Sequence, residues 1–327
     1  MAFASRLAGI SARQKSLILG FGCAAISGVS MVPQMFFKNQ YKKLLAMYQD
    51  SELVPVSQHV QNLIHQTTYD MNLEPLVEVD IEFFTCYGQD PVHIGSTTLR
   101  TGAMVGLPGT FRYADISDID TGKLMVSGRP PNWESRAGQQ LLHSIILTDD
   151  AKKFAIAREI EYAGNYHIHV IATMRGFFAC MAFATGNVLN TAFQLKSRLK
   201  TWARGITYIF VGAIWAGIYI TVKDTYECHR DKRNDRWVAS ISDTFAKGGL
   251  EYYNKMLERN KAIRTLMKAE GESLYTAYGN KTAGWRQPHV QITKRRDYMA
   301  KMVEGYQKGE VTARSRENRM KFGVGRV

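Results

Sequence analysis

The chain has 327 residues, of which 45% are hydrophobic and 22% charged, enough apolar material for a packed core in one or two domains. The formal net charge is +13, and most of the surplus falls in residues 223–327, with 23 Lys+Arg against 13 Asp+Glu. Four scattered cysteines without a C-x-x-C pair predict neither a disulfide framework nor a zinc–cysteine site. The basic C-terminal third fits an anionic lipid surface, an acidic partner or RNA, and equally a solvated basic surface.

The first 15 residues are basic and rich in small residues, and no acidic side chain precedes Asp50. A leader of this kind is typical of mitochondrial import, although a basic flank before an ordinary membrane anchor has the same composition. We therefore expect residues 1–15 to be a mitochondrial leader.

Three stretches without any charged residue predict membrane-spanning helices. Residues 16–37 are long enough to cross a bilayer, and residues 176–195 and 205–222 form a second hydrophobic region. A short basic loop separates the latter two, so we expect a two-helix transmembrane hairpin over residues 172–222. Small residues four apart predict close helix packing, and the absence of acidic residues from the spans argues against a transporter.

A hairpin returns the chain to the side of the membrane on which it began. Residues 38–171 and 223–293 are therefore expected to belong to one soluble domain, followed by a basic tail over residues 294–327. The basic loop and the basic leader both favour the matrix side. This orientation places the soluble domain in the intermembrane space.

The soluble domain is expected to contain a small antiparallel sheet and several helices, which makes the chain an α+β membrane protein. Hydrophobic and acidic residues alternate over residues 77–83, as in a half-exposed strand, and short β-type runs continue to residue 128. Residues 149–163 predict a helix with Thr148 as its N-cap and one buried face. A Gly248-Gly249 break is expected to separate two later helices.

The helix over 149–163 contains the candidate site. It reads Arg158-Glu159-Ile160-Glu161-Tyr162, where a zinc protease carries His-Glu-x-x-His, with both imidazoles on one helix face. The order of a glycine–proline hairpin at 102–109, this helix, a membrane hairpin and a later acidic helix resembles the HtpX and CAAX-protease group of membrane zinc proteases. That resemblance implies that Asp231 and Asp235 hold the positions of the third zinc ligand and of the Asp four residues after it.

Two departures remove the metal chemistry of that group. The Arg158 guanidinium is cationic and has no lone pair for zinc, and tyrosine is a rare ligand. Glu159 would then have no metal-bound water to activate. We therefore predict no catalytic residue, no metal and no cofactor, and a structural role for Arg158, Glu159, Tyr162, Asp231 and Asp235 as a degenerate protease-like site. Arg158 is expected to lie between Asp231 and Glu159 as a replacement for the metal.

A closer resemblance covers nearly the whole chain. The segments AMVGLPGTF, NWESRAGQQLLHSIILTDDAKKFAIAREIEY, GGLEYYNKMLERNKAIRTLMKAEGESLYTAYGN and KRRDYMAKM resemble the transmembrane protein 177 family. The resemblance implies a multi-pass protein of the mitochondrial inner membrane that associates with the chaperone of newly made cytochrome c oxidase subunit 2. It implies a non-catalytic scaffold whose partners are that subunit, its chaperone and inner-membrane lipid, with no small-molecule substrate and no nucleic acid.

Two other function classes stay open at this point. One is a divergent membrane metalloprotease, and the other is a lipid- or RNA-binding adaptor that acts through the basic C-terminal third. Weaker candidate sites are the pairs His167/His169 and Cys228/His229, and Arg175 at a span boundary. For each of these, packing or an interfacial position is the simpler interpretation.

Overall fold

The computed structural model describes residues 12–73, 78–122, 124–284 and 286–314, with side chains from Gly20 onward. It divides into two compact units, each built from two separate stretches of chain. The membrane unit comprises Met1–Phe37 and Tyr166–Tyr226, and the α/β unit comprises Lys38–Asn165 and Glu227–Val327. Most of the expected leader and the end of the basic tail lie outside the described residues.

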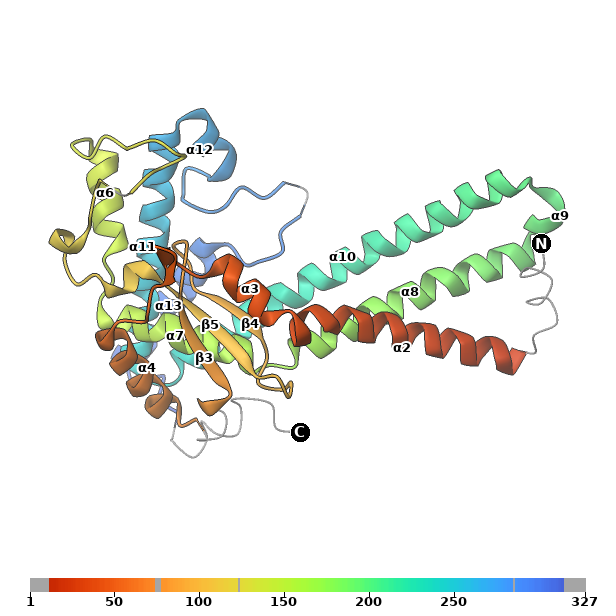
Figure 1. Cartoon of the computed structure of the whole chain (residues 1–327), viewed down its shortest axis with the longest axis horizontal. Coiled ribbons are helices and arrows are strands. Elements are labelled where there is room, and N and C mark those ends of the chain that lie inside the picture. Colours follow the sequence, from red (N-terminus) through yellow and green to blue (C-terminus); the bar gives the residue numbers. More distant parts are fainter. Residues whose placement is uncertain (1–11, 74–77, 123, 285, 315–327) are drawn as a thin grey trace. The chain divides into compact units, whose positions relative to one another are not determined.

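The membrane unit consists of long apolar helices (Figure 1). These are α2 (Ala12–Phe36), α8 (His167–Ala192) and the first part of α10 (Thr201–Ala239), with the short α9 (Leu195–Arg198) between the last two. Helices α8 and α10 are each long and apolar enough to cross a membrane. A third span results if Gly20–Phe36 and the following helix α3 (Lys38–Leu45) are counted as one broken helix. The two helices of the expected hairpin are therefore present, and both are candidate membrane spans by their length and composition.

Close packing in the membrane unit occurs between α2 and α8 and not within the hairpin. A Cβ added at Gly176 would lie 2.7 Å from the backbone oxygen of Cys23, so the two backbones are in near contact there. Helices α8 and α10 instead meet through large side chains, with the Trp215 indole N–H donating to Thr185 Oγ1 at 3.0 Å. A Cβ added at Gly212 or Gly217 would meet no atom of the described residues within 4 Å, apart from the backbone of its own helix. The close contact predicted for the small residues of α8 and α10 is therefore not formed at Gly212 or Gly217, whereas a Cβ added at Gly186 would lie 3.5 Å from the Tyr208 ring.

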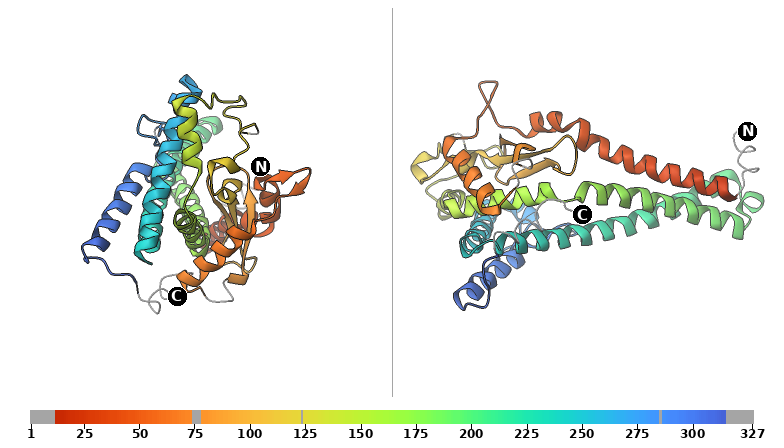
Figure 2. Two further views of the ribbon diagram at one scale, coloured as in Figure 1. Left: turned by 90° about the vertical axis from the view of Figure 1, so that its left-hand side faces the viewer. Right: turned by 90° about the horizontal axis from the view of Figure 1, so that it is seen from below.

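The α/β unit surrounds one central helix with a small sheet and several further helices (Figure 2). Its first stretch contains the following elements: α3, β1 (Tyr48–Gln49), β2 (Glu52–Leu53), α4 (Gln58–Met71), β3 (Ile81–Cys86), β4 (Val92–Gly95), β5 (Ala103–Pro108), η2 (Gly109–Arg112), η3 (Ile116–Asp118), α6 (Arg136–Ile145) and α7 (Asp149–Gly164). The second stretch contains the end of α10, α11 (Asp243–Met267), α12 (Ala269–Leu274) and α13 (Ile292–Gln307).

The main sheet is mixed, where a purely antiparallel one was expected. Its strand order is β3-β5-β4, with β3 and β5 parallel and β4 and β5 antiparallel. The segment 102–109 supplies the central strand β5 instead of a hairpin, and every residue of β5 is buried. The first strand also begins later than the alternating pattern suggested, at Ile81, because Glu78 and Val79 lie in a helical turn with Val79 85% exposed.

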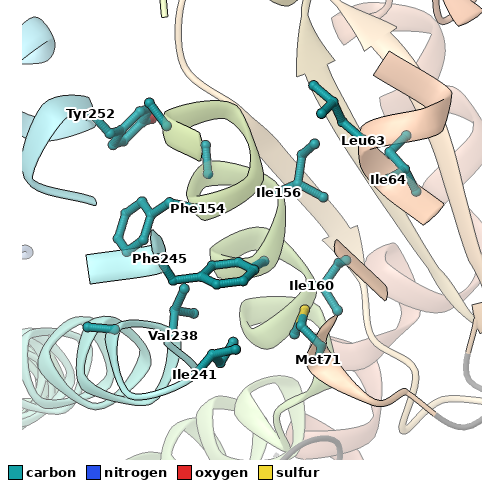
Figure 3. Packing of buried hydrophobic residues seen from close by; sticks show 14 of the residues in the cluster. Leu63, Ile64, Met71, Phe154, Ile156, Ile160, Val238, Ile241, Phe245 and Tyr252 are labelled. Carbon is teal, nitrogen blue, oxygen red and sulfur yellow. The ribbon is translucent and has the colours of Figure 1, made fainter. Parts of the chain in front are cut away.

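Helix α7 is the centre of the core. Thr148 is its N-cap, as predicted, and the hydroxyl accepts from the Ala151 N–H, while Asp149 and Asp150 occupy the favourable first turn. Its apolar side chains, among them Phe154, Ile156 and Ile160, pack against residues of α4, α10 and α11 (Figure 3). Burial is not confined to one face, however. Nearly every residue from Ala151 to Gly164 is buried, including four charged ones.

Gly248 and Gly249 lie inside α11 and do not break it. Their lack of a side chain lets α11 lie directly on α7. A Cβ on Gly248 would overlap the backbone carbonyl of Asp150, and one on Gly249 would lie 2.7 Å from the Phe154 ring. The glycine pair therefore serves helix packing, which outweighs the low helix propensity of glycine.

The substitution Gly248→Ala is expected to destabilise the protein although alanine favours helices. The new methyl group meets a backbone atom that cannot rotate away, so α11 must move from α7. Overpacking of this kind lowers the free energy of unfolding by about 1–3 kcal/mol. Thermal unfolding of the purified full chain measures the loss. Gly284→Ala, which has open space around the new Cβ, is the control, and equal midpoints for the two variants would contradict the close contact.

Candidate functional site

Five side chains singled out from the sequence come together in the core of the α/β unit. Helix α7 presents Arg158, Glu159 and Tyr162, and α10 presents Asp231 and Asp235; all five are buried. Other elements contribute further polar side chains that bond to them, among them His93, Tyr253 and Arg295. We call the whole set the Arg158–Arg295 network; it consists of His93, Arg158, Glu159, Tyr162, Asp231, Asp235, Tyr253 and Arg295.

Arg158 is paired with its own neighbour in sequence. Its Nε and Nη2 atoms donate to Glu159 Oε1 at 3.1 and 2.8 Å. The guanidinium also donates to the hydroxyl groups of Tyr252 and Tyr253, both at 3.4 Å, and lies 5.0 Å from the centre of the Tyr252 ring. The expected position of Arg158 between Glu159 and Asp231 is therefore wrong, because tyrosine hydroxyls and not an aspartate occupy its far side.

A second arginine, Arg295 of α13, pairs with Asp235 and lies near Asp231. Its Nε and Nη2 atoms donate to the two carboxylate oxygens of Asp235 at 2.6 and 2.7 Å, and Nη1 lies 3.9 Å from Asp231 Oδ2. Two hydroxyl groups complete the arrangement. Tyr162 donates to Asp231 Oδ1 at 2.5 Å, and Tyr253 donates to Asp235 Oδ1 at 2.7 Å. A bidentate interaction, in which an arginine donates two hydrogen bonds to one carboxylate, is the strongest geometry for such a pair.

The shifted pKa values agree with these roles. Burial alone would raise the pKa of Glu159, but Arg158 and the hydrogen bond from His93 outweigh it and hold the pKa below its ordinary value. Burial likewise opposes ionisation of Asp231, and His289 and Arg295 together bring that pKa well below its usual range. Burial raises the pKa of Tyr162, which stays a neutral donor. Both carboxylates are therefore ionised acceptors at neutral pH.

Both carboxylate oxygens of Glu159 are engaged. Oε1 accepts from Arg158, and Oε2 lies 2.8 Å from His93 Nδ1. Arg230 donates to His93 Nε2 at 3.2 Å, so the His93 proton is on Nδ1 and points to Glu159. The His93 ring also stacks on Tyr162 at a centroid distance of 5.3 Å. Both oxygens of the Glu159 carboxylate are therefore hydrogen-bond acceptors of neighbouring side chains, and neither oxygen is free.

The arrangement is suited to joining helices and poorly suited to binding a metal. A guanidinium and a neutral phenol occupy the two positions at which imidazoles would bind zinc. Within the described part of the chain, no group of three or more His, Cys, Asp or Glu side chains has the geometry of a metal site. The network instead connects β4, α7, α10, α11 and α13, which are far apart in sequence.

Three members of the network were missed in the sequence: His93, Tyr253 and Arg295. Arg295 carries a signal that periodicity could have revealed. It precedes Met299 and Val303 at four-residue intervals, so a cation lies on the buried face of α13. A charged residue on an apolar stripe indicates a buried partner. His93 and Tyr253 have no comparable signal, because both occur in ordinary strand or helix patterns.

The weaker candidates have structural contacts. The His167 ring stacks on Tyr226, and the Tyr166 and His169 rings are in edge contact, both within the membrane unit. Arg175 donates to the Tyr219 hydroxyl at 3.2 Å. In the α/β unit, Cys228 Sγ donates to the backbone oxygen of Gln287 at 3.5 Å. These contacts agree with the packing interpretation of each residue.

Glu161, next to the network on α7, differs from Glu159. It is 1% exposed, and neither carboxylate oxygen has a hydrogen-bond partner within the described residues. Burial raises its pKa to about 8, although Arg233, Arg314 and Arg230 lower it in part. The Glu161 carboxyl is therefore largely protonated at neutral pH.

The raised pKa of Glu161 predicts a pH-dependent stability. The folded state keeps the proton from pH 4.5 to about 8 while the unfolded state loses it. The stabilising contribution is therefore complete below pH 4.5 and is lost progressively between pH 4.5 and about 8, at up to about 1.4 kcal/mol per pH unit, with no further loss above that. Glu161→Gln should remove this slope in denaturant unfolding of the full chain. The exposed Glu258→Gln is the control, and a slope that persists in Glu161→Gln would assign the effect to another group.

Comparison with known proteins identifies the family. The model of the family described as "Transmembrane protein 177" matches residues 71–304 of this chain. The chain is 27% identical over 296 residues to transmembrane protein 177 of Danio rerio, covering 89% of this chain and 94% of the relative. It is 28% identical over 303 residues to the Homo sapiens protein of that name, covering 92% and 96% respectively. No solved structure gives a significant match. A family match over more than half of its length shows that the chain belongs to the transmembrane protein 177 family.

Proposed function

We propose that this protein is a non-catalytic scaffold of the mitochondrial inner membrane that assists the maturation of cytochrome c oxidase subunit 2 by binding the membrane chaperone of that subunit. Membership of the transmembrane protein 177 family and the apolar helices support a membrane protein. The basic leader supports the mitochondrial location.

The observation that carries the non-catalytic role is the bonding of Arg158, Glu159 and Tyr162. A zinc protease needs a carboxylate that is free to take a proton from metal-bound water. Here the carboxylate oxygens of Glu159 accept from Arg158 and His93, and Tyr162 donates to Asp231. Such a network holds the core helices together and leaves neither oxygen of Glu159 free to act as a base. The protein is accordingly proposed to be a pseudo-protease.

Co-isolation from mitochondria tests the proposed partners. The tagged full chain is crosslinked in intact mitochondria, solubilised and isolated, and the isolate is analysed for subunit 2 and its chaperone. Both should be enriched over an equally abundant, unrelated inner-membrane protein. Equal recovery of the three proteins would refute the scaffold role.

Metal and topology measurements test the remaining parts. The purified protein should contain zinc far below one equivalent and should not cleave unfolded substrates; one equivalent of zinc together with cleavage would establish the metalloprotease alternative.

Opening the outer membrane should expose the α/β unit to added protease. Protection of that unit until the inner membrane is opened would place it in the matrix.

A further inference from the structure

A pocket beside the Arg158–Arg295 network takes no part in the proposed scaffold function. It lies in the α/β unit between the end of α10, the start of α13 and the segment before α13, and has a volume of about 200 Å³. The residues that line it are mostly cationic: Lys232, Asp235, Arg236, Val290, Lys294, Arg295 and Tyr298. A space of this size suits a small headgroup more than a drug-sized ligand.

The charges of the lining leave a positive excess. Four cationic side chains face one carboxylate, Asp235, which is already paired with Arg295 through two hydrogen bonds. Lys232 and Lys294 are exposed and form no ion pair with another described residue. Three cations are therefore not neutralised by the lining.

One of the cationic groups is held in place, because Arg295 donates two hydrogen bonds to Asp235. Arg236 and Tyr298 both line the pocket, and the pKa of the Tyr298 hydroxyl is raised chiefly by burial and lowered in part by Arg236. Lysines at the rim supply mobile point charges, whereas arginines supply donors with fixed directions. Val290 and Tyr298 add a carbon surface beside these donors. Fixed and mobile cations beside an apolar wall match a phosphate group that carries an organic substituent.

We propose that this pocket binds a phosphate-bearing anion, either the headgroup of an anionic phospholipid or a free phosphate compound. A phosphate group has oxygens enough to accept from Lys232, Lys294 and Arg236 together, and its charge offsets the local excess. A zwitterionic headgroup is a poorer ligand, because its quaternary ammonium group would meet the same cations.

The test uses the purified full chain in a nonionic detergent, to which three compounds are added separately. These are short-chain phosphatidic acid, phosphatidylcholine with the same acyl chains, and inorganic phosphate. Binding is measured by native mass spectrometry for the lipids and by calorimetry for phosphate. Phosphatidic acid should bind more tightly than phosphatidylcholine, and Lys232→Ala and Lys294→Ala should each weaken it by about tenfold.

Lys261→Ala is the matched control, because Lys261 is an exposed lysine of α11 that does not line the pocket. Unchanged thermal unfolding of all three variants shows that they are folded. Binding of inorganic phosphate that both pocket variants weaken supports a free phosphate compound, and binding of phosphatidic acid alone supports a lipid headgroup. Equal affinity for the two lipids together with no binding of inorganic phosphate, or an equal loss in Lys261→Ala, would overturn the proposal.

Discussion

Replacing Arg158 by glutamate is expected to lower the free energy of unfolding by more than about 5 kcal/mol, and the variant should accumulate poorly. Arg158 is buried and is the main counter-charge of Glu159, which is itself 3% exposed. Removal of one partner from a buried ion pair costs about 3–5 kcal/mol, and the reversal adds a second buried carboxylate. Thermal unfolding of the full chain in detergent, followed by tryptophan fluorescence, measures the change.

Arg296→Glu is the control for this charge reversal. Arg296 pairs with Asp297 at the surface, where both side chains are more than a third exposed and such a pair contributes little. Its unfolding midpoint should stay close to that of the unchanged protein. If Arg158→Glu were as mild as Arg296→Glu, the Arg158–Glu159 pair would not be a structural element of the core.

Loss of Arg295 is expected to have the second largest effect. Arg295→Met leaves Asp235, which is 2% exposed, with Tyr253 as its remaining bonded donor in the network. The expected loss is about 3–5 kcal/mol. Adding Asp235→Asn to Arg295→Met removes the uncompensated charge and should recover part of the loss. A double-mutant cycle in denaturant unfolding gives the coupling energy between the two residues.

The control for this cycle is Lys308→Met, which removes a surface ion pair with Glu304 just after the same helix. It should change stability by less than about 1 kcal/mol. Strictly additive losses for Arg295→Met and Asp235→Asn would mean that the two groups act separately, contrary to the bidentate geometry.

Local patterns were enough to predict helix α7 and the apolar helices but not the mutual arrangement of the elements. The cap at Thr148 and the uncharged runs depend on neighbouring residues, and helices occur where these signals predict them. The resemblance to membrane zinc proteases also singled out the five residues of the candidate site. Arg295, however, lies 133 positions after Tyr162, and no sequence period relates the two. The pairing of Arg158 likewise depends on Tyr252 and Tyr253, which α11 brings from a distant part of the chain.

The sheet shows the same limit. Alternation of side chains indicates a strand but not its partner or direction, so β5 was interpreted as part of a hairpin. Its six consecutive buried residues are typical of a strand that is covered on both faces and paired on both edges. For α7, the spacing of apolar residues predicted only one buried face. The charged face is buried as well, because partners outside the helix neutralise its charges, and the sequence of the helix does not show those partners.

Because α7 is buried on every side, its folding depends on segments that are synthesised after it. Tyr162 is made 133 residues before Arg295. At roughly 5–20 residues per second, α7 is present for on the order of ten seconds before its last counter-charge exists. Throughout that interval its apolar and charged groups lack the cover that α11 and α13 later supply. A holding chaperone is therefore expected to bind α7, and chains that end before α13 should be degraded.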